Sequence, residues 1–179
     1  NAFGQSSGCV VNSFTTITPN TISSNGVGGL WGSNATWVGN VVPAPSDNVV
    51  IADGATVVVD RVLSVNNLTV GQGTSGILQW GATSFALTVN GNLNISNGAQ
   101  FNAFNTAAAG QSITLLGDLN NAGLASLAHT GTVLNMNGMK AGGQNINQSG
   151  NGVYMGTTGV VGTNKGIIRA LNVCNVATS

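Results

Sequence analysis

The sequence predicts an all-β chain folded as a parallel β-helix of about five to six coils, and three observations predict it. Amphipathic runs of good helix formers are missing, whereas Gly, Asn, Thr, Ser and Val dominate, which favours turns and strands. Residues 87–103 alternate between apolar and uncharged polar side chains. Related segments recur at offsets of 25 and 26 residues, a length that suits one coil of strands and turns.

The stretch LTVNGNLNISNGAQFNA (residues 87–103) is the clearest unit of this pattern. Its large apolar side chains share one parity and most of its polar side chains the other, as in strands with one buried and one solvated face. The stretch is longer than a usual strand of about 5 or 6 residues. The pairs Asn90-Gly91 and Asn97-Gly98 supply turns, so we expect three short strands separated by two corners.

The repeat is visible when VNNLTV (65–70), NGNLNI (90–95) and LGDLNN (116–121) are aligned. The aligned columns are Leu68, Leu93 and Leu119; Asn67, Asn92 and Asp118; Thr69, Asn94 and Asn120; and, further along, Gly73, Gly98 and Gly123. A degenerate fourth copy, LNMNGMK (134–140), places Gly138 21 residues after Gly117. One coil cannot bury its apolar face alone, whereas coils stacked about 4.8 Å apart bury a continuous column.

The competing fold is a β-sandwich of short strands, which is the usual solution for such a composition. It does not explain columns in register at 25 and 26 residues, so it ranks second. Residues 1–30 lack a clean repeat, and we expect them to form an N-terminal cap or arm. Residues 31–179 are then the β-helix domain.

Residues 30–60 carry a second pattern, namely a Trp, a polar loop, a second Trp, a Gly/Pro turn and then D-x-V-x-I-x-x-G-x-x-V-x-V-D. The residues that form it are Trp31, Trp37, Pro43, Asp47, Val49, Ile51, Gly54, Val57, Val59 and Asp60. This segment resembles the start of secreted bacterial right-handed parallel β-helix domains. It is similar to the extracellular eight-glycine domain and to surface proteins of gliding bacteria, over about residues 30–130. The resemblance implies a right-handed coil and an extracellular or cell-surface location, but it specifies no activity.

Charge and hydropathy exclude two classes of partner. The 179 residues include four Lys or Arg and four Asp, with no Glu, whereas an ordinary domain is roughly 25% charged. No basic stripe exists to neutralise phosphates, which argues against nucleic acid. No apolar run approaches the roughly 20 residues of a membrane span. The chain opens at Asn1 rather than Met, which fits a processed secreted protein or a trimmed chain.

The two cysteines, Cys9 and Cys174, lie near opposite ends of the chain. In a secreted protein they suggest a disulfide, within one chain or between subunits, and the alternative is a pair of buried thiols. A bridge within the chain requires the N-terminal segment to run back beside the last coil.

The residues that could carry catalysis are few. Asp47, Asp53 and Asp60 flank bends, where Asp is common for turn reasons alone, and Asp118 replaces Asn in a repeat column. The other ionisable candidates are Arg169, far along the chain, and His129, the sole histidine, which lacks partners for a triad or a zinc site. We expect no enzyme activity, no metal and no cofactor.

Four aromatic residues could stack on sugar rings, namely Trp31, Trp37, Trp80 and Tyr154. The alternative, which is commoner for such residues, is that they pack an end or a seam of the core.

Three hypotheses for function follow. The first is a non-enzymatic structural or adhesive module from a bacterial surface protein, or a fibre subunit that stacks on copies of itself through the β-helix ends or an N-terminal arm. Its partners would be itself or neighbouring modules. The second is a carbohydrate-binding module on a flat face of the β-helix lined with Asn, Thr and aromatic residues. The third, a polysaccharide-active enzyme, rests on fold analogy alone.

Overall fold

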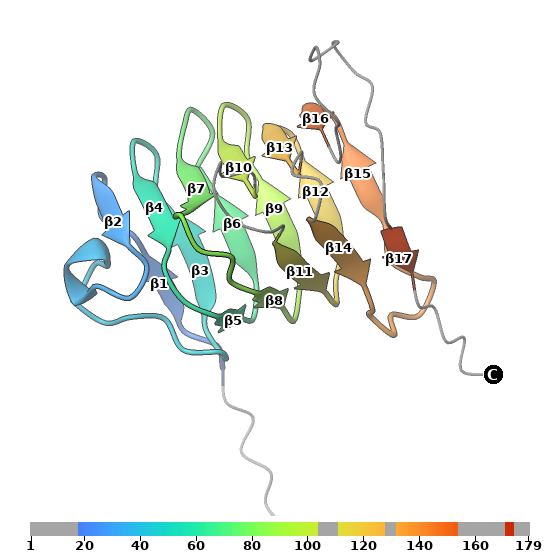
Figure 1. Cartoon of the computed structure of the whole chain (residues 1–179), viewed down its shortest axis with the longest axis horizontal. Helices are drawn as coiled ribbons and strands as arrows, with labels where there is room; N and C mark the ends of the chain where they lie inside the picture. The colour runs from blue at the N-terminus through green and yellow to red at the C-terminus, as the bar shows by residue number, and fades with distance from the viewer. Residues whose placement is uncertain (1–17, 104–110, 128–131, 154–170, 174–179) are drawn as a thin grey trace, which may run out of the picture.

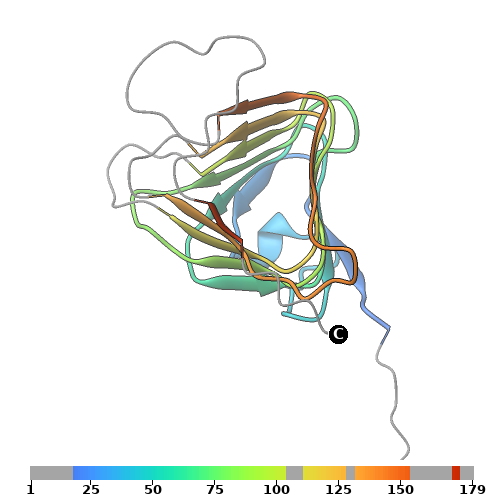
Figure 2. The ribbon, with the colours of Figure 1, turned by 90° about the vertical axis from the view of Figure 1, so that its right-hand side faces the viewer.

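The computed structural model is a parallel β-helix in which the chain winds around three sheets (Figure 1). The structure describes residues 18–103, 111–127, 132–153 and 171–173. Viewed from the C-terminal side, the chain turns anticlockwise as it approaches the viewer, so the coil is right-handed (Figure 2). All pairs between the named strands are parallel, which confirms the β-helix and excludes the antiparallel sandwich.

Each sheet collects one strand from every coil. The first sheet contains β1 (Thr21–Ser23), β3 (Asn48–Ile51), β6 (Leu68–Val70), β9 (Leu93–Ile95), β12 (Leu119–Asn121) and β15 (Ile146–Gln148). The second contains β2 (Gly28–Leu30), β4 (Thr56–Val59), β7 (Ile77–Trp80), β10 (Gln100–Asn102), β13 (Leu124–Ser126) and β16 (Asn151–Val153). The third contains β5 (Leu63–Val65), β8 (Leu87–Val89), β11 (Ser112–Leu115), β14 (Val133–Met136) and β17 (Leu171–Val173).

Among the described residues, the strands from β3 to β17 make five coils, which follow a partial first coil made of β1 and β2. The turn between the first and second sheets is called here the first corner, the next turn the second corner, and the turn back to the first sheet the third corner. At a spacing of about 4.8 Å, the five coils make a stack roughly 24 Å tall.

The strand register confirms the sequence repeat. Leu68, Leu93 and Leu119 are successive partners in the first sheet. Thr88 and Thr114 pair in the third sheet. The Gly73, Gly98 and Gly123 column holds only in part, because the first corner shortens from residues 71–76 to residues 96–99 and then to residues 122–123.

The core is a column of inward side chains that runs from β3 to β14. Burial alternates along the strands, as period two requires. The inward layers of the first sheet include Val49, Leu68, Leu93 and Leu119; those of the second Val57, Leu78 and Phe101; and those of the third Leu63, Leu87, Ile113 and Leu134. Since neighbouring coils also exchange backbone hydrogen bonds, stacking satisfies both the apolar and the polar groups of each strand.

The N-terminal end of the core is closed by a short 3-10 helix, η1 (Asn34–Thr36), and the two tryptophans around it. The Trp31 and Trp37 rings meet edge to face with centroids 4.8 Å apart. The Trp37 Nε1–H donates to the Trp31 carbonyl at 2.7 Å. Figure 2 shows η1 lying across the far end of the coil.

The edge of the first strand is partly covered by the same loop. The Val38 N–H donates to the Ser23 carbonyl at 2.9 Å, and the Asn25 N–H donates to the Thr36 carbonyl at 2.8 Å. Because β1 and β2 pair with β3 and β4, stacking begins at Thr21, upstream of the expected boundary at residue 31. Residues 1–17 of the expected cap or arm lie outside the described residues.

Candidate functional site

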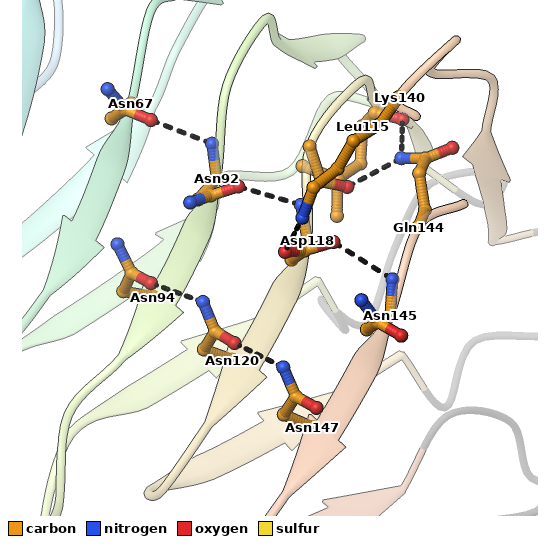
Figure 3. A network of polar contacts seen from close by, with 11 residues as sticks. Asn67, Asn92, Asn94, Leu115, Asp118, Asn120, Lys140, Gln144, Asn145 and Asn147 are labelled. Atoms are coloured by element: carbon orange, nitrogen blue, oxygen red, sulfur yellow. Dashed lines mark hydrogen bonds and ion pairs between the residues drawn. The ribbon is translucent and has the colours of Figure 1, made fainter. Parts of the chain in front are cut away.

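The outer face of the first sheet carries a ladder of asparagine amides, drawn in Figure 3. Asn94, Asn120 and Asn147 occupy the same position in three successive coils. The Asn120 Nδ2 donates to the Asn94 Oδ1 at 2.8 Å, and the Asn147 Nδ2 donates to the Asn120 Oδ1 at 2.7 Å. We call these three residues the outer ladder. It fixes the orientation of three amides along the helix axis.

A shallow groove of about 480 Å³ runs beside the outer ladder on β9, β12 and β15. The outer ladder forms one wall. The other wall is formed by small side chains at the start of the first corner, namely Ser96, Ala122 and Ser149. Register places these walls two residues apart on each strand, and the residues between them, Ile95, Asn121 and Gln148, form the floor. The groove is therefore parallel to the helix axis and lined by neutral groups.

A second column, here called the inner ladder, lies at the third corner and consists of Asn48, Asn67, Asn92, Asp118 and Asn145. From Asn67 onward, each side-chain Oδ1 accepts the backbone N–H of the next member. The N···O distances are 2.7 Å where the Asn67 Oδ1 is the acceptor, 2.8 Å for the Asn92 Oδ1 and 2.9 Å for the Asp118 Oδ1. The side chains thus supply acceptors to backbone donors at the corner, where strand pairing is interrupted.

Asp118 is the charged member of the inner ladder, and it pairs with Lys140 from a longer third corner. The hydrogen bond from Lys140, followed by the backbone N–H of Asn145, lowers the pKa of Asp118 below its ordinary value. Gln144 braces the same corner, because its side chain accepts from the Gly138 N–H at 2.6 Å and donates to the Leu115 carbonyl at 2.9 Å. Asp118 is therefore a structural acceptor.

Asp53 performs the corresponding task at the first corner. Its carboxylate accepts the backbone N–H of Gln72 at 2.7 Å, the Thr74 hydroxyl at 2.8 Å and the Ser75 N–H at 3.1 Å. These bonds to the ionised form, chiefly that from Gln72, lower the pKa of Asp53 to about 2. The carboxylate orders the long corner of the next coil.

The remaining two aspartates also hold backbone. The Asp47 carboxylate accepts the Ala44 N–H at 2.8 Å. The Asp60 carboxylate accepts the Gly32 N–H at 3.0 Å and contacts Arg61 at 3.2 Å. All four carboxylates of the chain thus accept backbone hydrogen bonds, each at a different turn of the chain.

No three His, Cys, Asp or Glu side chains gather as a metal site within the part of the chain that the structure describes. His129, Arg169, Tyr154, Cys9 and Cys174 lie outside the described residues. The proposed disulfide and the Tyr154 sugar contact therefore stay predictions.

The three tryptophans that could stack on sugars are instead buried. Trp31, Trp37 and Trp80 are 0–2% exposed. Trp80 meets Phe101 edge to face with centroids 5.5 Å apart, and its Nε1–H donates to the Phe85 carbonyl at 2.9 Å. A buried indole presents no ring face to a ligand, so these residues follow the packing alternative.

Sequence reasoning identified Asn94 and Asn120 as one column but missed the third rung, Asn147. The fourth copy of the repeat was placed at residues 134–140, which belong to β14 and the third corner at an offset of 21 residues. Because the third corner is extended over residues 137–145, Asn147 follows Asn120 only after 27 residues. The low wall of the groove was also missed. Small side chains at a turn carry no signal of a groove until the register sets them beside the ladder.

Comparisons with protein-family models, with curated proteins and with solved structures found no match to this chain. Among the described residues, no helix has the length and apolar character needed to cross a bilayer.

Proposed function

We propose that this chain is a non-enzymatic structural or adhesive module that works outside the cell or at a bacterial surface. The observation that carries the proposal is the use of the carboxylates. Glycoside hydrolysis uses two carboxyl groups placed on either side of the scissile bond. Here all four carboxylates accept backbone N–H groups at separate corners, where their role is to hold the coil together.

The surface supports the same proposal. With eight charged residues in 179, the polar part of the surface consists mainly of amides, hydroxyls and backbone. Such a surface lacks the long-range repulsion that keeps most soluble proteins apart. A low-charge, regularly spaced face suits close contact with another extended polymer or with neighbouring modules.

The closed N-terminal end bears on the fibre version of the proposal. The Trp31–Trp37 loop already occupies part of the edge of the first coil. Head-to-tail stacking through that end would displace this loop, so a fibre would form through other surfaces or through the N-terminal arm.

Two measurements test the proposal. Incubation with a panel of polysaccharides should release no reducing ends or unsaturated products. Cleavage that disappears in Asp118→Asn would instead make the chain an enzyme. Negative-stain electron microscopy over a concentration series, with and without reductant, should then separate isolated short stacks from regular fibres.

Removing the two indoles of the Trp31–Trp37 loop provides a further test of the fibre question. If this loop blocks end-to-end pairing, Trp31→Ala/Trp37→Ala should associate at concentrations where the parent chain stays monomeric. Fibres of the parent chain in which the Trp31–Trp37 contacts are unchanged would favour lateral or arm-mediated assembly.

Carbohydrate binding is the second candidate, and the groove on the first sheet is the observation that favours it. In this form the adhesive module would hold a glycan without transforming it.

A further inference from the structure

We propose that the groove beside the outer ladder binds a neutral polysaccharide chain lying along the helix axis. The inference rests on the adhesive role proposed above and names its ligand class. It places the contacts on amides and small side chains of the first sheet rather than on the tryptophans, which are buried.

The direction of the groove matches an extended polymer. The outer ladder and the small wall repeat once per coil, with the spacing of about 4.7–4.9 Å between paired strands. A polymer with a short regular repeat can therefore present equivalent groups to Asn94, Asn120 and Asn147 in turn. A compact ligand would use only one rung.

The hydrogen-bonding capacity of the ladder matches hydroxyl groups. A side-chain amide has two N–H donors and two acceptor lone pairs. Asn120 donates one hydrogen to Asn94 and accepts one from Asn147, so the ladder uses one donor and one acceptor of this central amide. Each rung thus keeps at least one donor and one acceptor outside the ladder, in an orientation the ladder fixes. A sugar hydroxyl, which donates and accepts at once, is the complementary group.

The charge of the groove selects against acidic ligands. None of the residues that line the groove is ionisable. The nearby Lys140 is already paired with Asp118 at the third corner, as Figure 3 shows. Desolvating a carboxylate or sulfate without a cation is costly, so the groove suits neutral glycans rather than uronates or sulfated chains.

The low wall leaves room for the ligand. Ala122 and Ser149 are exposed and small, so the wall at the first corner is low in the two C-terminal coils of the groove. Binding then depends on several weak polar contacts along three coils, and its strength should grow with chain length.

The test is retention of the purified chain on insoluble polysaccharides at neutral pH. The neutral set is cellulose, chitin, mannan and xylan, and the acidic set is cross-linked polygalacturonate and alginate. Ala122→Leu fills the groove and Asn147→Ala removes the last rung. Ala82→Leu and Asn137→Ala make the same changes at exposed positions on other corners.

We expect the parent chain to be retained on at least one neutral polymer and on neither acidic polymer. Ala122→Leu should weaken retention about tenfold and Asn147→Ala about threefold, with both controls within about twofold of the parent. Circular dichroism and the urea midpoint check that each variant folds. Ser149→Leu serves as a second groove-filling variant if Ala122→Leu does not fold.

Two results would overturn the inference. One is retention of the parent chain on no neutral polymer or on acidic polymers alone. The other is equal retention of the groove-filling variants and the Ala82→Leu control. Reducing ends measured in the same supernatants keep the two proposals apart. Cleavage would contradict the non-enzymatic role, whereas absent binding without cleavage would overturn only the groove.

Discussion

The inner ladder should contribute measurably to stability, and removal of one rung tests this. Asn92→Ala removes the Oδ1 that accepts the Asp118 N–H at 2.8 Å. Leaving a buried donor unsatisfied costs about 1–3 kcal/mol. Because this corner is only partly buried, we expect the lower half of that range, or about 1–2 kcal/mol.

Asn67→Ala provides the internal comparison, because it removes two bonds. The Asn67 Oδ1 accepts the Asn92 N–H at 2.7 Å, and its Nδ2 donates to the Asn48 Oδ1 at 2.8 Å. We therefore expect Asn67→Ala to lower the free energy of unfolding at least as much as Asn92→Ala does. Asn97→Ala, at an exposed position in a first corner, should change it by less than about 0.5 kcal/mol.

Urea unfolding followed by tryptophan fluorescence and far-ultraviolet circular dichroism measures these differences. The two probes must give coincident transitions, since repeat proteins can lose cooperativity. The urea dependence should be unchanged, so that a shift in midpoint reports stability alone. Equal free energies for Asn67→Ala, Asn92→Ala and Asn97→Ala would refute the view that the ladder stabilises the corner.

Three further predictions follow from the corners. The folded-state pKa of Asp53 is about 2, below its ordinary value, so the contribution of this carboxylate to stability is fully present above about pH 4 and lost as pH falls through about 2. The urea midpoints of the parent chain and of Asp53→Asn should therefore converge as pH falls over that window. A difference in midpoint that stays constant with pH would contradict this prediction. Gly98→Ala places a Cβ 2.3 Å from the backbone of the preceding coil at φ +74°, whereas a Cβ at Gly39, with φ +82°, meets nothing within 4 Å. Gly39→Ala should therefore lower the free energy of unfolding by about 1–2 kcal/mol, and Gly98→Ala by clearly more. Equal unfolding free energies for the two variants would refute the clash. Lys140→Met should raise the pKa of Asp118 toward its ordinary value, which carboxyl carbon shifts in an NMR titration will show; an unchanged pKa would mean that Lys140 does not hold this carboxylate.

The sequence predicted the coil because the information that defines it is local and repeated. Alternation of period two identifies which side of a strand is buried, and Leu68, Leu93 and Leu119 recur at the length of one coil. Stacking then follows, since every coil must bury the same apolar face. The prediction extended to side chains at the strands, where Asn94 and Asn120 were aligned and do form a ladder.

The features that could not be predicted from the sequence depend mainly on corners of unequal length. The third corner of residues 137–145 hides Asn147 from the repeat and brings Lys140 to Asp118. The exposure of aromatic residues was equally undetermined, because Trp31 and Trp37 pack over the core end only once the chain folds back across it. By itself, the sequence determined the period and the buried face, because both are set by neighbouring residues. The tertiary structure alone decided which polar side chains share a face and form a groove, because that depends on the register between coils.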